Sequence, residues 1–439
     1  MTIEIELKFI ATPQAAGKLA ELLSTLPHQH QAARELTNIY FETDDNQLRR
    51  WDMGLRIRGV DQRYEMTLKA AGQTLGGLHQ RPEYNVELSE PVLDIARLPA
   101  EIWPQGTDVA ALQPRLQPLF TTHFQREIWL ITTGNSEIEV AFDQGEVTAG
   151  DLSEPLCEIE LELKRGERQD LLAFAQQLVA LGGLRMGSLS KAARGYQLAQ
   201  GNPPRQIQPF PLLKAGAKAT VEQGMVAAMS AGLHHWQYHE EVWLRGNAAA
   251  QDAVREALDL LRQAFSLFGA LVPRKASSAL RQQLTTLEET LVNEEQDAAT
   301  FCLSSLSVES VETQLALTHW LAESQWRQWI DAKGEAKLQG SYKRFSDIML
   351  SRVNADLRET FITVKQPNEY QDKATRLARQ LLTVHLLAGF YPSEAVVSWL
   401  DPWQQLLSAI HEKQTSGLAW LAMQALKQPP FWLTSGAGR

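Results

Sequence analysis

The sequence has few cysteines, no excess of positive charge and no long apolar run. Its 439 residues include only two cysteines, Cys157 and Cys302. They exclude a disulfide framework and a cysteine-rich zinc site, and they fit a reducing compartment. The formal net charge of -10 argues against nucleic-acid binding by bulk charge. No run approaches the ~20 apolar residues that a membrane helix needs, and charges begin at Glu4. We therefore expect no signal peptide, no membrane partner and a cytoplasmic location.

Two halves of the chain follow different periods. Alternation with period two or β-rich composition predicts strands at residues 3–9, 54–60, 63–69, 83–89, 127–132, 137–142 and 157–163, with helices near 13–26 and 168–182. A Gly/Pro-rich stretch at 201–205 follows, and beyond it the amphipathic pattern is almost wholly helical. We therefore predict an α+β protein with a first domain at 1–200, a linker at 201–215 and an all-α domain of two helical bundles at 216–439.

The first predicted strand carries charge on one face. Because successive side chains of a strand alternate, Glu4, Glu6 and Lys8 share a face, and the apolar residues between them share the other. Two carboxylates about 7 Å apart repel each other unless water or a cation screens them. Divalent cations such as Mg²⁺ prefer such oxygen ligands. The alternative is an ordinary amphipathic strand with a solvated face.

The same spacing recurs on other predicted strands. Glu158, Glu160 and Glu162 repeat the acidic pattern, and Arg56 and Arg58 alternate within a basic strand. Further strand charges are Lys69, Arg81, Arg126 and Asp143. Several charged strands of both signs predict a closed sheet with a charged interior. Such an interior must hold an ion, because buried unpaired charges are costly. A metal ion together with a phosphate chain would match both sets of charges.

These residues resemble the CYTH superfamily, the triphosphate tunnel metalloenzymes. The resemblance rests on Glu-x-Glu-x-Lys at 4–8, Leu-Arg-x-Arg at 55–58, a downstream strand lysine and Glu-x-Glu-x-Glu at 158–162. Ser-Leu-Ser-Lys at 188–191 stands where the family has a late tunnel lysine. The resemblance covers about residues 1–200 and implies an antiparallel eight-stranded β tunnel. The helical half resembles the CHAD domain, which is linked to polyphosphate binding, and the order of the two looks closest to bacterial CYTH–CHAD inorganic triphosphatases.

The resemblance implies a metal-dependent inorganic triphosphatase that hydrolyses tripolyphosphate to pyrophosphate and phosphate with Mg²⁺ or Mn²⁺. The implied metal ligands are Glu4, Glu6, Asp143, Glu158, Glu160 and Glu162. The implied substrate-binding residues are Lys8, Arg56, Arg58, Lys69, Arg81, Arg126 and Lys191. Catalytic roles are implied for Lys8, Lys69 and Tyr40, with a Lys8–Tyr40 proton relay as one arrangement. Tyr40 could equally be an aromatic strand residue that packs beside Phe41.

Other functions remain open at this point. Cyclases of the superfamily share the metal and phosphate residues, so a nucleoside triphosphatase or a class IV-type adenylate cyclase is an alternative, although no adenine-reading motif is present. A thiamine triphosphatase would need an aromatic residue for its substrate, and Trp51 and Trp103 are available. A non-catalytic protein that only binds polyphosphate is a further alternative.

The helical half departs from the CHAD pattern. Arg255 and Arg262 are seven residues apart and share a helical face, but Asp252 replaces an expected histidine and Asp259 replaces a basic residue. The aspartates argue against polyphosphate contact here and favour a scaffold or regulatory role. His235 and His239 have a spacing that can bind zinc, but no third ligand is evident, so a solvated or interface pair is favoured.

Overall fold

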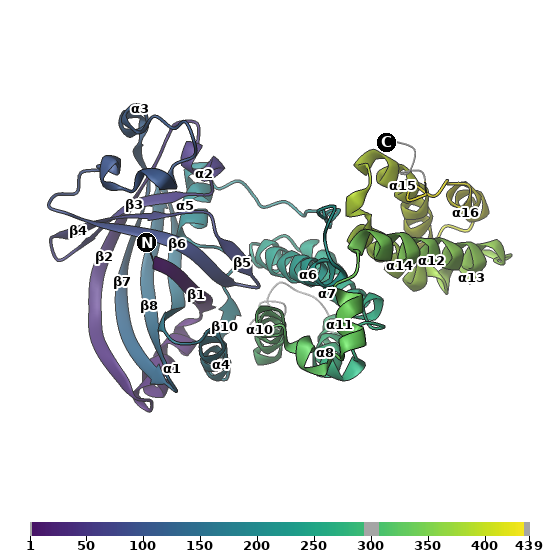
Figure 1. Ribbon diagram of the computed structural model, residues 1–439, viewed down its shortest axis with the longest axis horizontal. Helices are drawn as coiled ribbons and strands as arrows, with labels where there is room; N and C mark the ends of the chain where they lie inside the picture. The colour runs from purple at the N-terminus through teal and green to yellow at the C-terminus, as the bar shows by residue number, and fades with distance from the viewer. Residues whose placement is uncertain (1, 294–306, 434–439) are drawn as a thin grey trace. The chain divides into compact units, whose positions relative to one another are not determined.

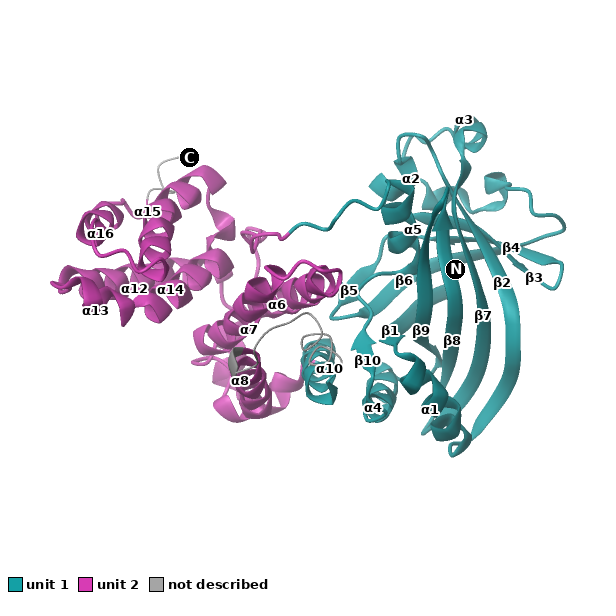
Figure 2. Cartoon of the chain, turned by 180° about the vertical axis from the view of Figure 1, so that it is seen from behind, with its two compact units in different colours: residues 1–206, 295–323 teal, residues 207–294, 324–439 magenta. Residues whose placement is uncertain are grey.

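The computed structural model describes residues 2–293 and 307–433, which divide into two compact units. Unit 1 contains residues 1–206 and 295–323, and unit 2 contains residues 207–294 and 324–439 (Figure 1, Figure 2). A segment from beyond residue 300 therefore belongs to the unit that holds the strands. Cys302 lies outside the described residues. Over those residues, no helix is both long and apolar enough to cross a membrane.

Unit 1 is built around one antiparallel sheet. Its ten strands are β1 (Thr2–Ala11), β2 (His28–Glu42), β3 (Gly54–Val60), β4 (Arg63–Lys69), β5 (Gln73–Leu75), β6 (Leu78–Leu88), β7 (Gln117–Thr133), β8 (Ser136–Ala149), β9 (Leu152–Arg165) and β10 (Leu184–Met186). Eight of them follow the order β1-β9-β8-β7-β2-β3-β4-β6, and a β1–β6 pairing closes the ring. Short β10 and β5 extend β1 and β6. The predicted eight-stranded tunnel is thus confirmed.

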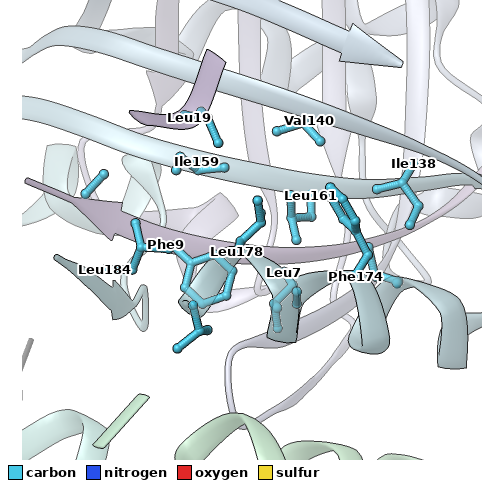
Figure 3. Packing of buried hydrophobic residues seen from close by; sticks show 14 of the residues in the cluster. Leu7, Phe9, Leu19, Ile138, Val140, Ile159, Leu161, Phe174, Leu178 and Leu184 are labelled. Atoms are coloured by element: carbon cyan, nitrogen blue, oxygen red, sulfur yellow. The ribbon is translucent and has the colours of Figure 1, made fainter. Parts of the chain in front are cut away.

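Alternation along the strands separates an outer apolar core from the tunnel interior. Leu7 and Phe9 of β1 are fully buried on the outer face, where Ile159 and Leu161 of β9 join them (Figure 3). Helices α1 (Pro13–Ser24) and α4 (Arg168–Val179) cover this face through residues such as Leu178. Burying these side chains leaves the other face of the same strands, with its charges, inside the ring.

Helix α5 (Lys191–Ala199) brings a lysine to the tunnel. Ser190 caps its N-terminus by accepting a hydrogen bond from the Ala193 amide, so Lys191 is the first helical residue. Gly195 lets the helix approach closely, because a Cβ there would lie 2.1 Å from a ring carbon of Phe120. Lys191 is therefore held in a buried position by packing that starts several residues away.

The remaining short helices of unit 1 lie outside the ring. They are α2 (Gln47–Arg50) and α3 (Val109–Leu112), with 3-10 turns at Ile95–Arg97, Ala100–Ile102 and Gln113–Arg115. The segment that contains these turns covers the outer face of β3 and β4. Trp51 and Trp103 pack in this outer core. They lie among apolar residues rather than among the charges of the tunnel.

Unit 2 is helical, as predicted. Its helices are α6 (Val221–Leu244), α7 (Ala250–Leu267), α8 (Ser278–Asn293), α11 (Ala332–Leu338), α12 (Tyr342–Ile362), α13 (Pro367–Gln371), α14 (Ala374–Leu387), α15 (Ser393–His411) and α16 (Leu418–Leu426), with 3-10 turns at Arg274–Ala276, Gln325–Trp329 and Ala388–Phe390. Helix α14 packs against α7, α12 and α15. In the sequence, α10 (Val308–Ala322) comes before α11 and ends before Ser324, whose φ is 48°. This helix end was not predicted.

Candidate active site

A cavity of about 800 Å³ fills the interior of the ring. All seven cationic residues implied by the resemblance line it: Lys8, Arg56, Arg58, Lys69, Arg81, Arg126 and Lys191. Of the implied acidic residues, four line it: Glu4, Glu6, Glu160 and Glu162. Tyr40 lines it as well. Side chains that are up to 187 positions apart in the sequence (Glu4 to Lys191) thus meet in one cavity.

Acidic side chains gather on the wall formed by β1, β9 and β8. Glu6 pairs in register with Glu162, and Glu162 pairs with Glu139 of β8, so three carboxylates form a row across neighbouring strands. Like charges placed directly opposite one another destabilise a sheet. At roughly 5 Å and an effective dielectric constant of about 20, each pair costs about 3 kcal/mol. A divalent cation would remove this repulsion, and carboxylate oxygens are its preferred ligands.

Glu4 extends this wall beside Glu83 and Lys69. Burial raises the pKa of Glu4 to about 7, Glu6 and Glu83 push it further up, and the Lys69 ammonium opposes them. Lys69 forms an ion pair with Glu4 and lies 3.9 Å from Glu83. Burial also raises the pKa of Glu162. Lys164 of β9 also lines the cavity and lies 2.9 Å from Glu162 and 3.9 Å from Glu139.

Arg56 and Arg58 lie on the opposite wall, whereas Arg81 lies on β6 in register with Glu4. In the ring, β9 and β3 are four strands apart in either direction, and β3 carries Arg56 and Arg58. Among the residues that the structure describes, no carboxylate forms an ion pair with Arg56, Arg58 or Arg81. The Nε atoms of Arg56 and Arg81 are buried without a hydrogen-bond partner. Burial and the neighbouring Arg56 and Arg126 lower the pKa of Arg58 to about 10. Guanidinium groups with free donors in a cavity fit phosphate oxygens.

A second group of charges is already neutralised. Its three carboxylates, Asp143, Glu158 and Glu160, have ligand atoms within 4.8 Å of one another, the one such group among the described residues. Four cations contact them: Lys8 lies 2.8 Å from Glu160, Lys191 2.7 Å from Asp143, Arg126 2.6 Å from both Asp143 and Glu160, and Arg194 3.6 Å from Glu158.

This ion-pair cluster has its own electrostatics. Burial would lower the pKa of Lys8, but Glu158 and Glu160 outweigh it and raise the pKa above its ordinary value. For Glu160, burial acts upward, but Lys191, Lys8 and Arg126 hold the pKa well below its usual range. Asp143 and Glu158 are fully buried and do not line the cavity. The cluster fits a metal less well than the row of Glu6 and Glu162, because its carboxylates already form ion pairs with buried cations.

The geometry around Tyr40 bears on the proposed relay. The Tyr40 hydroxyl accepts a 3.4 Å hydrogen bond from Arg56, whereas Lys8 contacts Glu158 and Glu160. Burial acts to raise the pKa of Tyr40, but the charge and hydrogen bond of Arg56, together with the charges of Lys191 and Arg58, outweigh it and lower the pKa. Tyr40 also stacks on Phe120 with ring centroids 4.5 Å apart. The structure therefore links Tyr40 to the arginine wall.

Sequence reasoning assigned no role to several cavity residues. They include His79, Glu83 and Glu139, and also Glu65, Asn85 and Lys164. The sequence spacing could have identified Glu83 and Glu139. Each lies two positions along an alternating strand from another charged residue or another residue that faces the interior, and therefore shares its face. His79 had none, because its role depends on the register that places it opposite Glu6.

Comparisons with known proteins identify both halves. Residues 2–196 match the family model of the CYTH domain, and residues 227–423 match that of the CHAD domain. The chain carries a CYTH domain followed by a CHAD domain. A Haemophilus influenzae protein named as an inorganic triphosphatase is 41% identical over 203 residues. That match covers 45% of this chain and 55% of the relative, so the chain spans about half the length of the curated relative that it matches.

Solved structures resemble each domain separately. A Hippeastrum protein, named as a candidate adenylyl cyclase and described as having a dominant triphosphatase activity, is 21% identical, with a TM-score of 0.35. The match covers 44% of this chain and 95% of that one. The CHAD domain of Ricinus communis is 17% identical, with a TM-score of 0.35, and the match covers 53% of this chain and 94% of that one.

The arginines of the CHAD domain differ from those of the tunnel. Arg379 contacts Asp259 at 3.1 Å, and Arg376 donates to Asp356 from Nε at 3.0 Å. Arg262 forms an ion pair with Glu288, and Arg255 lies 3.4 Å from Asp252. Asp259, which the sequence analysis marked as a disruption of a basic face, therefore neutralises an arginine directly.

His235 and His239 do not form a metal site. Their ring centroids are 4.1 Å apart, and both nitrogens of His239 have partners: the His235 carbonyl at 2.8 Å and the Gln208 amide at 3.1 Å. Burial lowers the pKa of His235 to about 3, so its ring is neutral. The pair is a packed interface, one of the two arrangements that the sequence analysis favoured.

Proposed function

We propose that this protein is a metal-dependent inorganic triphosphatase that hydrolyses tripolyphosphate to pyrophosphate and phosphate inside the tunnel. The observation that carries the proposal is the opposition, across one cavity, of a carboxylate-rich wall with Glu6 and Glu162 and a wall on which Arg56 and Arg58 form no ion pair. A metal bound to a short phosphate chain is a ligand that satisfies both walls at once. The Haemophilus relative's name supports the same activity.

The two walls have separate tasks in this proposal. Glu4, Glu6 and Glu162, with Glu83 and Glu139 nearby, would hold Mg²⁺ or Mn²⁺, which supplies charge neutralisation and activates water. Arg56, Arg58 and Arg81 would bind the phosphate oxygens with their free donors. Phosphoryl transfer needs little covalent help from a protein, so fixed positive charge beside the developing negative charge carries most of the catalysis.

The ion-pair cluster would serve the same reaction indirectly. Asp143 and Glu158 hold the ammonium groups of Lys8 and Lys191 at one end of the cavity. A raised pKa keeps Lys8 protonated, so its role is electrostatic rather than that of a base. We therefore assign metal binding to the row containing Glu6 and a positioning role to Asp143 and Glu158.

The choice of an inorganic substrate rests on the lining of the cavity. Trp51 and Trp103, the residues considered for an organic base or thiamine ring, pack in the outer core. The cavity is lined mainly by charged side chains that suit phosphates. A nucleoside or thiamine triphosphatase, a cyclase and a pure polyphosphate binder remain alternatives. For the CHAD domain we propose a scaffold role, because Arg262 and Arg379, which belong to its candidate basic face, each have an acidic partner. A cytoplasmic location remains a prediction.

The test is phosphate release by the full chain with Mg²⁺ or Mn²⁺, comparing tripolyphosphate, ATP and thiamine triphosphate. The proposal requires clear selectivity for tripolyphosphate and no turnover in excess EDTA. Faster turnover of ATP, with cyclic AMP among the products, would replace it with the cyclase alternative. Tight tripolyphosphate binding without turnover of any substrate would identify a binding protein.

A further inference from the structure

Helix α10 lies in the CHAD half of the sequence but belongs to the core of the tunnel unit. Val311 and Leu315 are 1% and 0% exposed and lie in the same apolar cluster as Leu171 and Leu184. Figure 2 shows α10 in the colour of unit 1. Val308 and Ala322 pack at its edge. These positions share one face of a helix. Because the CYTH match ends at residue 196, this helix is an addition to the tunnel from outside the CYTH domain.

Polar contacts hold the C-terminal part of α10 against the tunnel unit. Arg168 of α4 donates from Nε to the carboxylate of Glu323, the first residue after α10, at 2.7 Å. It also donates to the carbonyl of Ala322, the last residue of α10. Thr318 is fully buried, and its hydroxyl lies 2.9 Å from both the Gly76 carbonyl and the Gln314 carbonyl of its own helix, so the two acceptors share its one hydrogen. The helix therefore forms hydrogen bonds with α4 and with the β5–β6 hairpin.

The β5–β6 hairpin, which Thr318 contacts, has a two-residue turn. Gly76 and Gly77 have φ values of 56° and 91°, the left-handed conformation that such turns require and that glycine adopts without strain. Strand β5 has only three residues and pairs on one side alone, with β6. A strand this short contributes few hydrogen bonds, so an additional contact from α10 changes its stability appreciably.

From the hairpin, the contacts continue into the cavity. Thr74 of β5 lies 3.0 Å from Nδ1 of His79 through its hydroxyl. His79 lines the cavity and stands opposite Glu6 in the β1–β6 pairing. The path from Thr318 to the acidic wall thus passes through one turn and two side chains, Thr74 and His79.

We propose that α10 is a positioning element of the tunnel, with Thr318 holding the β5–β6 hairpin so that β6 keeps His79 against Glu6. The segment joined to the CHAD domain would thereby set the geometry of the acidic wall. The part of this inference that concerns metal affinity rests on the proposed function, whereas the part that concerns the hairpin does not.

The experiment compares three variants of the full chain: Thr318→Val, Thr318→Ser and Thr313→Val. Thr313 is the matched control, because it is on the same helix, is 1% exposed and likewise donates to the carbonyl four residues earlier. For Thr318→Val we expect amide hydrogen exchange at residues 73–80 to accelerate by roughly 2- to 10-fold. We expect Mn²⁺ affinity, measured by calorimetric titration, to fall by about 2- to 5-fold, less than for a direct partner of a metal ligand. Thr318→Ser should restore both values.

Each outcome decides part of the inference. Equal exchange at residues 73–80 in Thr318→Val and Thr313→Val would overturn the hairpin clamp. Faster exchange with unchanged Mn²⁺ affinity would overturn the link from the hairpin to the acidic wall. If the native chain binds no Mn²⁺, the proposed metal site is wrong, and the exchange rates still decide the clamp. If Thr318→Val unfolds, failure of Thr318→Ser to match the native exchange rates would overturn the proposal.

Discussion

Charged residues are arranged differently in the tunnel and in the CHAD domain. The cavity keeps like charges together, with Glu6 opposite Glu162 on one wall and Arg56 beside Arg58 on another. The helices of the CHAD domain pair charges of opposite sign, as in Arg379 with Asp259. Segregated charge is costly for the fold alone, so it indicates a ligand, whereas paired charge is complete without one. The number of arginines in a segment therefore says less about anion binding than the presence or absence of acidic partners.

The strongest test of this comparison is Glu6→Ala. Removing one carboxylate of the acidic row should abolish metal-dependent turnover, by at least about 10³-fold, because the metal contributes several kcal/mol to the transition state. Glu127→Ala is the control, because Glu127 of β7 pairs with His30 instead of lining the cavity. Equal loss in both variants would contradict the assignment.

Glu158→Gln tests the neutralised group inside the tunnel. Glu158 is fully buried and contacts Lys8 and Lys191, so its loss leaves buried cations without a partner. We expect the free energy of unfolding to drop by about 3–5 kcal/mol in urea denaturation. Asp151→Asn, at an exposed turn, should have little effect. A stable Glu158→Gln protein that had lost Mn²⁺ binding would instead make Glu158 a metal ligand.

Arg56→Ala tests the basic wall. Loss of one guanidinium from the phosphate-binding side should raise KM for tripolyphosphate by roughly 10- to 100-fold, in keeping with about 1.5–3 kcal/mol for a hydrogen bond to a charged group. Steady-state kinetics on Arg56→Ala and on the exposed control Arg63→Ala would measure it. Unchanged kinetics for Arg56→Ala would remove the polyanion-binding role of this wall.

Arg376→Ala should have the smallest effect. Its ion pair with Asp356 is partly exposed, and such pairs contribute about 0–1 kcal/mol. Because Arg376 is already neutralised, retention of long-chain polyphosphate by the full chain should change by less than about two-fold, and Arg255→Ala should behave alike. Clear loss of retention in either variant, with Arg56→Ala unaffected, would reverse the comparison and place polyphosphate binding in the CHAD domain.

Much of the tunnel could be predicted from alternating residues. In β3, Arg56 and Arg58 alternate with apolar residues, and this pattern predicts both the strand conformation and the charged face. Strand β2 could not be predicted in the same way, because its first eight residues are exposed and lack alternation. It forms because it pairs with β7 along nearly its whole length. Such pairing is a long-range property that a local pattern does not contain.

The candidate site was predicted as a set of residues but not as an arrangement. The motifs identified Glu6 and Glu158 alike as acidic strand positions. Their neighbours separate them, since Glu6 faces Glu162 in an open cavity and Glu158 is enclosed by Lys8 and Lys191. Lys191 itself reaches the cavity from a helix, through packing of Gly195 against Phe120.

Local patterns in this chain were sufficient to predict where strands give way to helices, and which face of each strand is charged, because both follow from the period of the side chains. They could not predict which charges would meet. That depends on ring order and register, which place β9 across from β3 and His79 opposite Glu6. It also depends on helix α10, which lies in the CHAD half of the sequence and yet completes the core of the tunnel, because burial of Val311 and Leu315 is available there.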